Sequence, residues 1–104
     1  MKINEVYTAY ISWGKQGKRR PVLILKTKAD SVVVFKITTK YNNKSDYIKS
    51  KYYKISDLKA TGLSKQSYID TMSKYELRLD MTKFKRIGQL STEDIWGLKQ
   101  FISK

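Results

Sequence analysis

The chain contains neither cysteine nor histidine, and each absence removes a class of chemistry. Without cysteine there is no disulfide framework, zinc ribbon or thiol nucleophile. Without histidine there is no Ser–His triad, no histidine-based phosphodiester chemistry and little basis for the usual zinc or copper sites. The side chains left for catalysis are those of Arg, Lys, Asp, Glu, Tyr, Ser and Thr.

Long apolar runs are also missing from the 104 residues. No run approaches the roughly 20 residues that a membrane span needs, and the start lacks the apolar segment of a signal peptide. We therefore expect a cytoplasmic protein with no membrane partner. Internal repeats, low-complexity tracts and linkers are absent as well, so residues 1–104 are expected to form a single domain.

Acidic residues are scarce: 9 Asp and Glu face 22 Lys and Arg, a formal net charge of +13. The imbalance lies mostly in residues 1–60, which hold 14 basic and 4 acidic side chains, whereas residues 61–104 hold 8 and 5. A basic surface of this density favours a polyanionic partner, nucleic acid first, and the alternative is an ordinary solvated basic surface.

The apolar pattern predicts several short antiparallel strands. The segment 26–30 suits a hairpin turn between two of them. The predicted strands are Val6–Trp13, Val22–Leu25, Val32–Ile37, Tyr47–Ile55, Tyr68–Met72 and Phe84–Ile87.

Helical signals are fewer. Ser56 and Gly62 bracket a short capped turn. Ser91-Thr92-Glu93-Asp94 resembles a capping box, after which Ile95, Leu98 and Ile102 share one helical face with Phe101 beside it. The predicted fold class is α+β, mainly β: a small antiparallel barrel closed by a C-terminal helix.

The segment from Trp13 to Pro21 is the first candidate for an active site. It reads as a loop with two glycines and four cations, and Pro21 fixes the backbone where the next strand begins. Arg20 is therefore expected at a rigid edge, where a guanidinium can act on a phosphate rather than only attract it. Trp13 is either an outward residue that stacks on a base or a core residue of its strand.

Metal chemistry needs carboxylates that converge on one place. The candidates are Asp70, Glu76, Asp80, Glu93 and Asp94, but Glu93 and Asp94 are better explained as charges at a helix N-terminus. We expect no metal and no cofactor.

Phosphoryl chemistry by a guanidinium and a hydroxyl remains. RNA carries its own nucleophile in the 2′-hydroxyl, so a protein needs only to align it and to stabilise the developing charge. Thr38 and Thr39, which close a predicted strand, are the candidate hydroxyls, although strand propensity alone also explains the pair. The basic polar segment 40–44 follows them and is able to line a groove for single-stranded nucleic acid.

Four segments, in this order and spacing, resemble the MazF/PemK ribonuclease toxins of bacterial toxin–antitoxin pairs. The likeness runs from about Val6 to the C-terminus. The segments are Gly17–Leu25, Ile37-Thr38-Thr39, Gly62–Ile69 and Ile87–Ser91.

The resemblance implies an SH3-like barrel that acts as a homodimer and cleaves single-stranded RNA without metal. The products would carry 2′,3′-cyclic phosphate and 5′-hydroxyl ends. The family's catalytic arginine falls on Arg20, which would act in proton transfer and phosphate stabilisation, and its threonine falls on Thr38. Ser67 matches a serine near the groove, and the expected partner is an acidic antitoxin. The other residues expected to hold RNA are Trp13, Lys15, Gln16, Lys18, Arg19, Thr39 and Lys40.

Two other functions stay open at this point. One is a non-enzymatic toxin that poisons DNA gyrase, as the structurally similar CcdB family does. The other is an RNA-binding module without activity. Arg20 together with Thr38 favours the nuclease.

Overall fold

The computed structural model describes residues 1–13 and 15–104, with side chains described outside residues 11–14. Across this part of the chain, six antiparallel strands form one sheet in the order β4-β5-β3-β2-β1-β6. They are β1 (Glu5–Trp13), β2 (Gln16–Thr27), β3 (Ser31–Thr38), β4 (Tyr52–Lys54), β5 (Tyr68–Arg78) and β6 (Lys83–Gln89).

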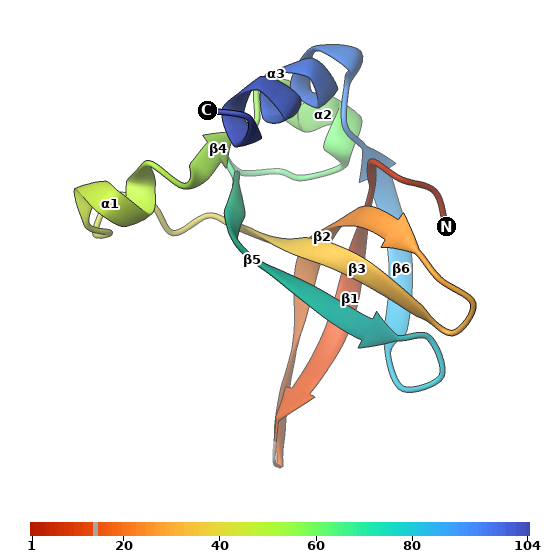
Figure 1. Ribbon diagram of the computed structural model, residues 1–104. Coiled ribbons are helices and arrows are strands. Elements are labelled where there is room, and N and C mark those ends of the chain that lie inside the picture. The colour runs from red at the N-terminus through yellow and green to blue at the C-terminus, as the bar shows by residue number, and fades with distance from the viewer. Residues whose placement is uncertain (14) are drawn as a thin grey trace.

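The sheet is strongly bent, so that β3 and β5 cross the direction of β1 and β6 (Figure 1). Among the described residues the two outermost strands, β4 and β6, do not pair, and the sheet is therefore open. The expected mainly β architecture with a C-terminal helix is confirmed in this open form.

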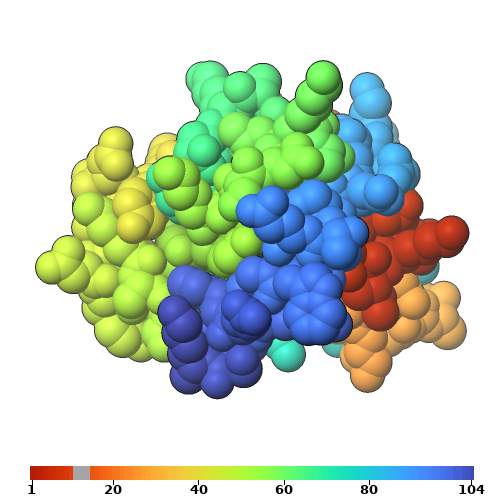
Figure 2. Space-filling model, turned by 90° about the horizontal axis from the view of Figure 1, so that it is seen from above, coloured from red at the N-terminus to blue at the C-terminus, as the bar shows by residue number. Residues whose placement is uncertain are grey.

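The described residues also form three helices, α1 (Asp46–Lys49), α2 (Leu58–Thr61) and α3 (Thr92–Ile102). As expected, Ser91 caps α3: its hydroxyl accepts a hydrogen bond from the N–H of Asp94 at 3.1 Å. The N-cap of α2 is Asp57 rather than Ser56, and Gly62 ends this helix in the left-handed conformation, with φ 77°. Both α2 and α3 lie at one end of the sheet (Figures 1 and 2).

The strand predicted over Tyr47–Ile55 is wrong for most of its length. Only Tyr52–Lys54 pair with β5, whereas residues 46–49 form the helical turn α1. Lysines alternate with apolar and aromatic residues over this segment, a pattern that is also typical of a half-exposed strand. The hydroxyl of Ser45 caps the start of this turn, because it accepts the N–H of Ile48.

The loop predicted over 13–21 is wrong for residue 13 and residues 16–21, because β1 and β2 continue as paired strands from Thr8↔Pro21 to Trp13↔Gln16. Residue 14 of this prediction lies outside the described residues. Glycine and charged residues have low strand propensity, which the pairing with β1 overrides. Pairs between β2 and β3 begin at Val22, so Pro21 lies on a stretch of β2 that β1 alone borders. A residue without an N–H fits such a position.

Successive residues of β2 and β3 point into two different apolar clusters. Leu23 and Phe35 belong to one, which packs under α3 through Leu98. Val22 and Val34 belong to the other, on the opposite face. We call these the helix-side and pocket-side clusters. The buried helix-side residues are Val6, Leu23, Phe35, Ile37, Ile55, Ile69, Leu90 and Leu98. The buried pocket-side residues are Ala9, Val22, Ile24, Val32 and Val34.

Candidate functional site

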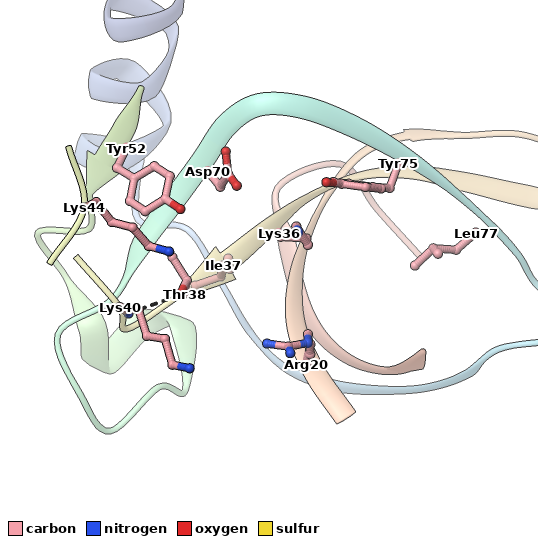
Figure 3. A pocket seen from close by; sticks show the side chains of 10 residues that line it. All are labelled: Arg20, Lys36, Ile37, Thr38, Lys40, Lys44, Tyr52, Asp70, Tyr75 and Leu77. Atoms are coloured by element: carbon pink, nitrogen blue, oxygen red, sulfur yellow. Dashed lines mark hydrogen bonds between the residues drawn. The ribbon is translucent and has the colours of Figure 1, made fainter. Parts of the chain in front are cut away.

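A cavity of about 460 Å³ adjoins the pocket-side cluster, which shares Leu77 with it. Side chains from β2, β3, β4, β5 and the segment after β3 meet in it (Figure 3). The lining residues are Arg20, Lys36, Ile37, Thr38, Lys40, Lys44, Tyr52, Asp70, Tyr75 and Leu77.

Four of the lining residues are cations, and the lining contains neither histidine nor glutamate. The ammonium of Lys36 lies over the ring of Tyr75, 4.8 Å from its centroid. Cations gathered in a concave site with apolar walls focus a positive potential and attract anions. The lining therefore has the charge expected of a phosphate-binding pocket. The cations are Arg20, Lys36, Lys40 and Lys44.

Arg20 reaches the pocket from the middle of β2. It pairs with buried Ala9 of β1 and stands two residues before buried Val22, and residues two apart point to the same face of a strand. Its guanidinium is directed towards the side of the pocket where Thr38 and Lys40 lie (Figure 3). A paired strand holds its main chain, which is a firmer support than the loop edge predicted from the sequence.

Thr38 is the last residue of β3, a strand that pairs directly with β2. Its Oγ1 accepts a hydrogen bond from the N–H of Lys40 at 3.1 Å. This bond turns the chain so that Lys40 also lines the pocket. The two predicted catalytic residues, Arg20 and Thr38, thus line the same cavity from neighbouring strands.

Asp70 and Tyr52 also line the pocket, and the sequence did not predict this role for either of them. Asp70 of β5 pairs with Lys36 of β3 on one side and with Tyr52 of β4 on the other. Burial, followed by the negative charge of Asp70, raises the pKa of the Tyr52 hydroxyl above its ordinary value. Nothing in the local sequence marks these two residues, because their meeting depends on which strands are neighbours.

The residues predicted at the hairpin end do not line the cavity. Lys15, Gln16 and Lys18 are exposed. Arg19 points away from Arg20, and its guanidinium donates to Oγ1 of Thr8 at 3.1 Å. The side chain of Trp13 lies outside the described residues.

Two further residues that were predicted to contact RNA, Thr39 and Ser67, do not belong to the pocket lining. Thr39 is exposed beside Thr38. Ser67 is buried, and its hydroxyl donates to the carbonyl oxygen of Lys65 at 2.8 Å. The Ser67 hydroxyl is thus used to hold the turn before β5, and it does not belong to the pocket lining.

Within the described residues, no three side chains of the Asp, Glu, His or Cys type gather where a metal ion would bind. None of the described helices has both the length and the apolar character needed to cross a membrane. A scan of the chain against models of protein families finds no match, and neither does a search of curated proteins. The chemistry of the pocket is therefore the basis for a functional assignment.

Proposed function

We propose that this protein is an endoribonuclease of the MazF/PemK type, which cleaves single-stranded RNA with Arg20 and Thr38 and without a metal ion. The observation that carries the proposal is their position: the two residues come from neighbouring strands and line one pocket with three lysines. A guanidinium and a hydroxyl beside bound phosphate are sufficient for a reaction whose nucleophile belongs to the substrate.

In this reaction the 2′-oxygen attacks the adjacent phosphorus atom. The bond from phosphorus to the 2′-oxygen forms while the bond to the 5′-oxygen breaks. The 2′-hydroxyl gives its proton to water and the departing 5′-oxygen takes one from water, so the protons balance and the products carry 2′,3′-cyclic phosphate and 5′-hydroxyl ends. Arg20 binds the non-bridging oxygens with its planar fork and assists the proton transfer.

Thr38 is oriented for a complementary role. Its hydroxyl oxygen already accepts the N–H of Lys40, and a hydroxyl that accepts one bond still has its own hydrogen to donate. We assign that hydrogen to a phosphate oxygen that gains charge in the transition state. Lys36, Lys40 and Lys44 supply the attraction that brings the RNA backbone into the pocket.

The finer features implied by the resemblance belong to the same proposal. They are closure of the bent sheet into an SH3-like barrel, a homodimer, a cytoplasmic location and an acidic antitoxin as partner. The cationic pocket supports the last of these, because a disordered acidic segment that folds on binding would occupy it in place of RNA.

The direct test is cleavage in the presence of a chelator. Purified protein incubated with an unstructured RNA and excess EDTA is expected to give discrete fragments that end in 2′,3′-cyclic phosphate, at the rate seen without EDTA. Loss of cleavage in EDTA would contradict the metal-free mechanism. Intact RNA together with inhibited supercoiling by DNA gyrase would instead identify the non-enzymatic class of toxin.

A second expectation concerns salt. Each phosphate neutralised on a single strand contributes about −0.7 to the slope of log affinity against log salt concentration. If each of the four lining cations neutralises one phosphate, the slope is about −3. The measurement is fluorescence anisotropy of a labelled RNA between low and high salt. A flat salt response would show that this pocket does not bind the RNA backbone.

A further inference from the structure

The proposed nuclease makes no use of the carboxylate in its pocket. Asp70 is the one acidic side chain among the described residues that line the cavity, and it shares that cavity with four cations. It lies on β5, whereas Arg20 lies on β2, with β3 between them. Asp70 is level with Val22 through Lys36, and Arg20 stands two residues further along β2. With neighbouring strands about 4.8 Å apart and a rise of about 3.3 Å per residue, the main chains at Asp70 and Arg20 are separated by about 12 Å.

The side chain of Asp70 is held in place. Its Oδ1 accepts the N–H of Met72 at 2.9 Å, and its Oδ2 has no hydrogen bond from the described residues. The ring of Tyr52 lies at the same end of the pocket, away from Arg20 (Figure 3). This end therefore combines a fixed hydrogen-bond acceptor with an aromatic surface.

A carboxylate repels a phosphate, so Asp70 itself is unsuited to contact the RNA backbone, which the nearby Lys36 and Lys44 attract. Asp70 suits a group that donates N–H bonds. When a phosphate is bound at Arg20, the part of the same nucleotide able to reach Asp70 is its base. Carboxylates in nucleic-acid complexes accept hydrogen bonds from exocyclic amino groups such as N4 of cytosine.

We propose that Asp70 selects the base of the bound nucleotide by accepting a hydrogen bond from its exocyclic amino group. This inference rests on the proposed function in that it takes RNA as the ligand of the pocket. Cytosine, adenine and guanine carry such a group. Uracil has a carbonyl oxygen where cytosine has its amino group, and that oxygen would face the carboxylate with two sets of lone pairs opposed. Asp70 therefore discriminates mainly against uracil.

The test uses binding alone, so that it does not depend on cleavage. Short homopolymers of cytidine, adenosine and uridine with 2′-fluoro sugars lack the nucleophile, and any register on the protein presents the same base. Fluorescence anisotropy is expected to show about tenfold tighter binding of the cytidine oligomer than of the uridine oligomer. The adenosine oligomer, which shares the amino group, is also expected to bind more tightly than the uridine oligomer.

In Asp70→Asn the preference for cytidine over uridine is expected to disappear or reverse. The amide oxygen that keeps the N–H of Met72 leaves the NH2 group facing the base, where it donates to the uracil carbonyl and opposes the cytosine amino group. The new net charge raises affinity for every oligomer alike and cancels in the ratio. The amide oxygen can still accept the N–H of Met72, so the fold is expected to persist. The matched control is Asp30→Asn, an exposed aspartate in the turn between β2 and β3, and it should keep the wild-type ratio.

Equal binding of the cytidine and uridine oligomers by the wild-type protein would overturn the inference. So would an unchanged ratio in Asp70→Asn. If natural RNA is bound with this selectivity but never cleaved, the nuclease proposal fails while the role of Asp70 stands.

Discussion

Replacing Arg20 with lysine is expected to lower the single-turnover rate of RNA cleavage by about 10²–10³-fold, the usual effect of losing one preorganised donor to a developing charge. RNA affinity is expected to change little, because lysine keeps the positive charge. What lysine lacks is the planar fork that holds two phosphate oxygens at once. The measurement is cleavage at saturating protein, beside a binding titration for the same variant.

The position of Arg20 on a paired strand supports an effect on the cleavage rate rather than on affinity. Arg20 stands on a paired strand over buried Ala9, so its main chain is fixed even though its side chain is exposed to the pocket. A lysine at the same position would have a fixed main chain and a freely rotating ammonium. The loss is therefore expected in the chemical step rather than in binding.

Two variants serve as controls. Arg78→Lys makes the same exchange at an exposed residue of β5 that pairs with Asp80, and it is expected to leave the cleavage rate unchanged. Lys18→Ala removes a charge from the exposed hairpin and is expected to weaken binding without slowing the chemical step. If Arg20→Lys cleaves at nearly the wild-type rate under saturation, Arg20 is a binding residue and its catalytic assignment is wrong.

Asp94→Asn is expected to lower the free energy of unfolding by about 2–4 kcal/mol, because several buried donors then lose a charged acceptor. The Asp94 carboxylate is fully buried. It accepts the N–H groups of Ser56 and Asp57, each at 2.9 Å, and the hydroxyls of Tyr53 at 2.8 Å and Ser91 at 3.3 Å. These bonds tie α3 to the segment that joins β4 and α2.

The same carboxylate makes stability depend on pH. Burial by itself raises the pKa of Asp94, but the hydrogen bonds from the main chain of Asp57 and Ser56 and from the two hydroxyls outweigh it and hold the pKa below its ordinary value. Burial and the bond to Asp94 raise the pKa of Tyr53 to about 12. A lowered folded-state pKa gives stability that is complete above the ordinary aspartate value and is lost as the pH falls through the folded-state value.

Denaturant unfolding of the wild type and of Asp94→Asn at neutral and acidic pH measures both effects. The difference between them is expected to shrink as the pH falls below the ordinary aspartate pKa, where the unfolded chain takes up the proton first, and to be lost near the lower pKa of the folded carboxyl. Glu93→Gln is the matched control: this exposed neighbour in the first turn of α3 is expected to change stability by less than about 1 kcal/mol. Equal stability of the wild type and Asp94→Asn at neutral pH would show that the network contributes nothing.

The strands were predictable where apolar residues formed continuous runs, whereas the alternating pattern of Tyr47–Ile55 was misleading over most of its length. Val32–Ile37 is a nearly continuous run, and it lies within β3 as expected. The strand over residues 16–21 was not predictable from local signals, because it comes from pairing with β1 and not from the residue types of the segment. Asp94 is a charge at the N-terminus of α3, as expected, but its burial depends on the distant main chain of Ser56 and Asp57 and was not predictable.

The candidate site was likewise predictable from the sequence only in part. Arg20 and Thr38 were named from the sequence through residue chemistry and the resemblance, and each lies on the pocket. Asp70 and Tyr52 join them only because β5 lies beside β3 and β4 lies beside β5. Such an order of strands is a property of the whole sheet, and the residues of one segment do not reveal it.

The two apolar clusters lie on opposite faces of the sheet, so residues of the pocket can be exchanged without disturbing the packing of α3. Of the described pocket residues, Ile37 alone also belongs to the helix-side cluster. Exchanges at Lys36, Lys44 or Tyr52 therefore alter what the pocket accepts while the seat of α3 stays intact. The lining of the pocket can therefore change one residue at a time while α3 and the helix-side cluster stay as they are.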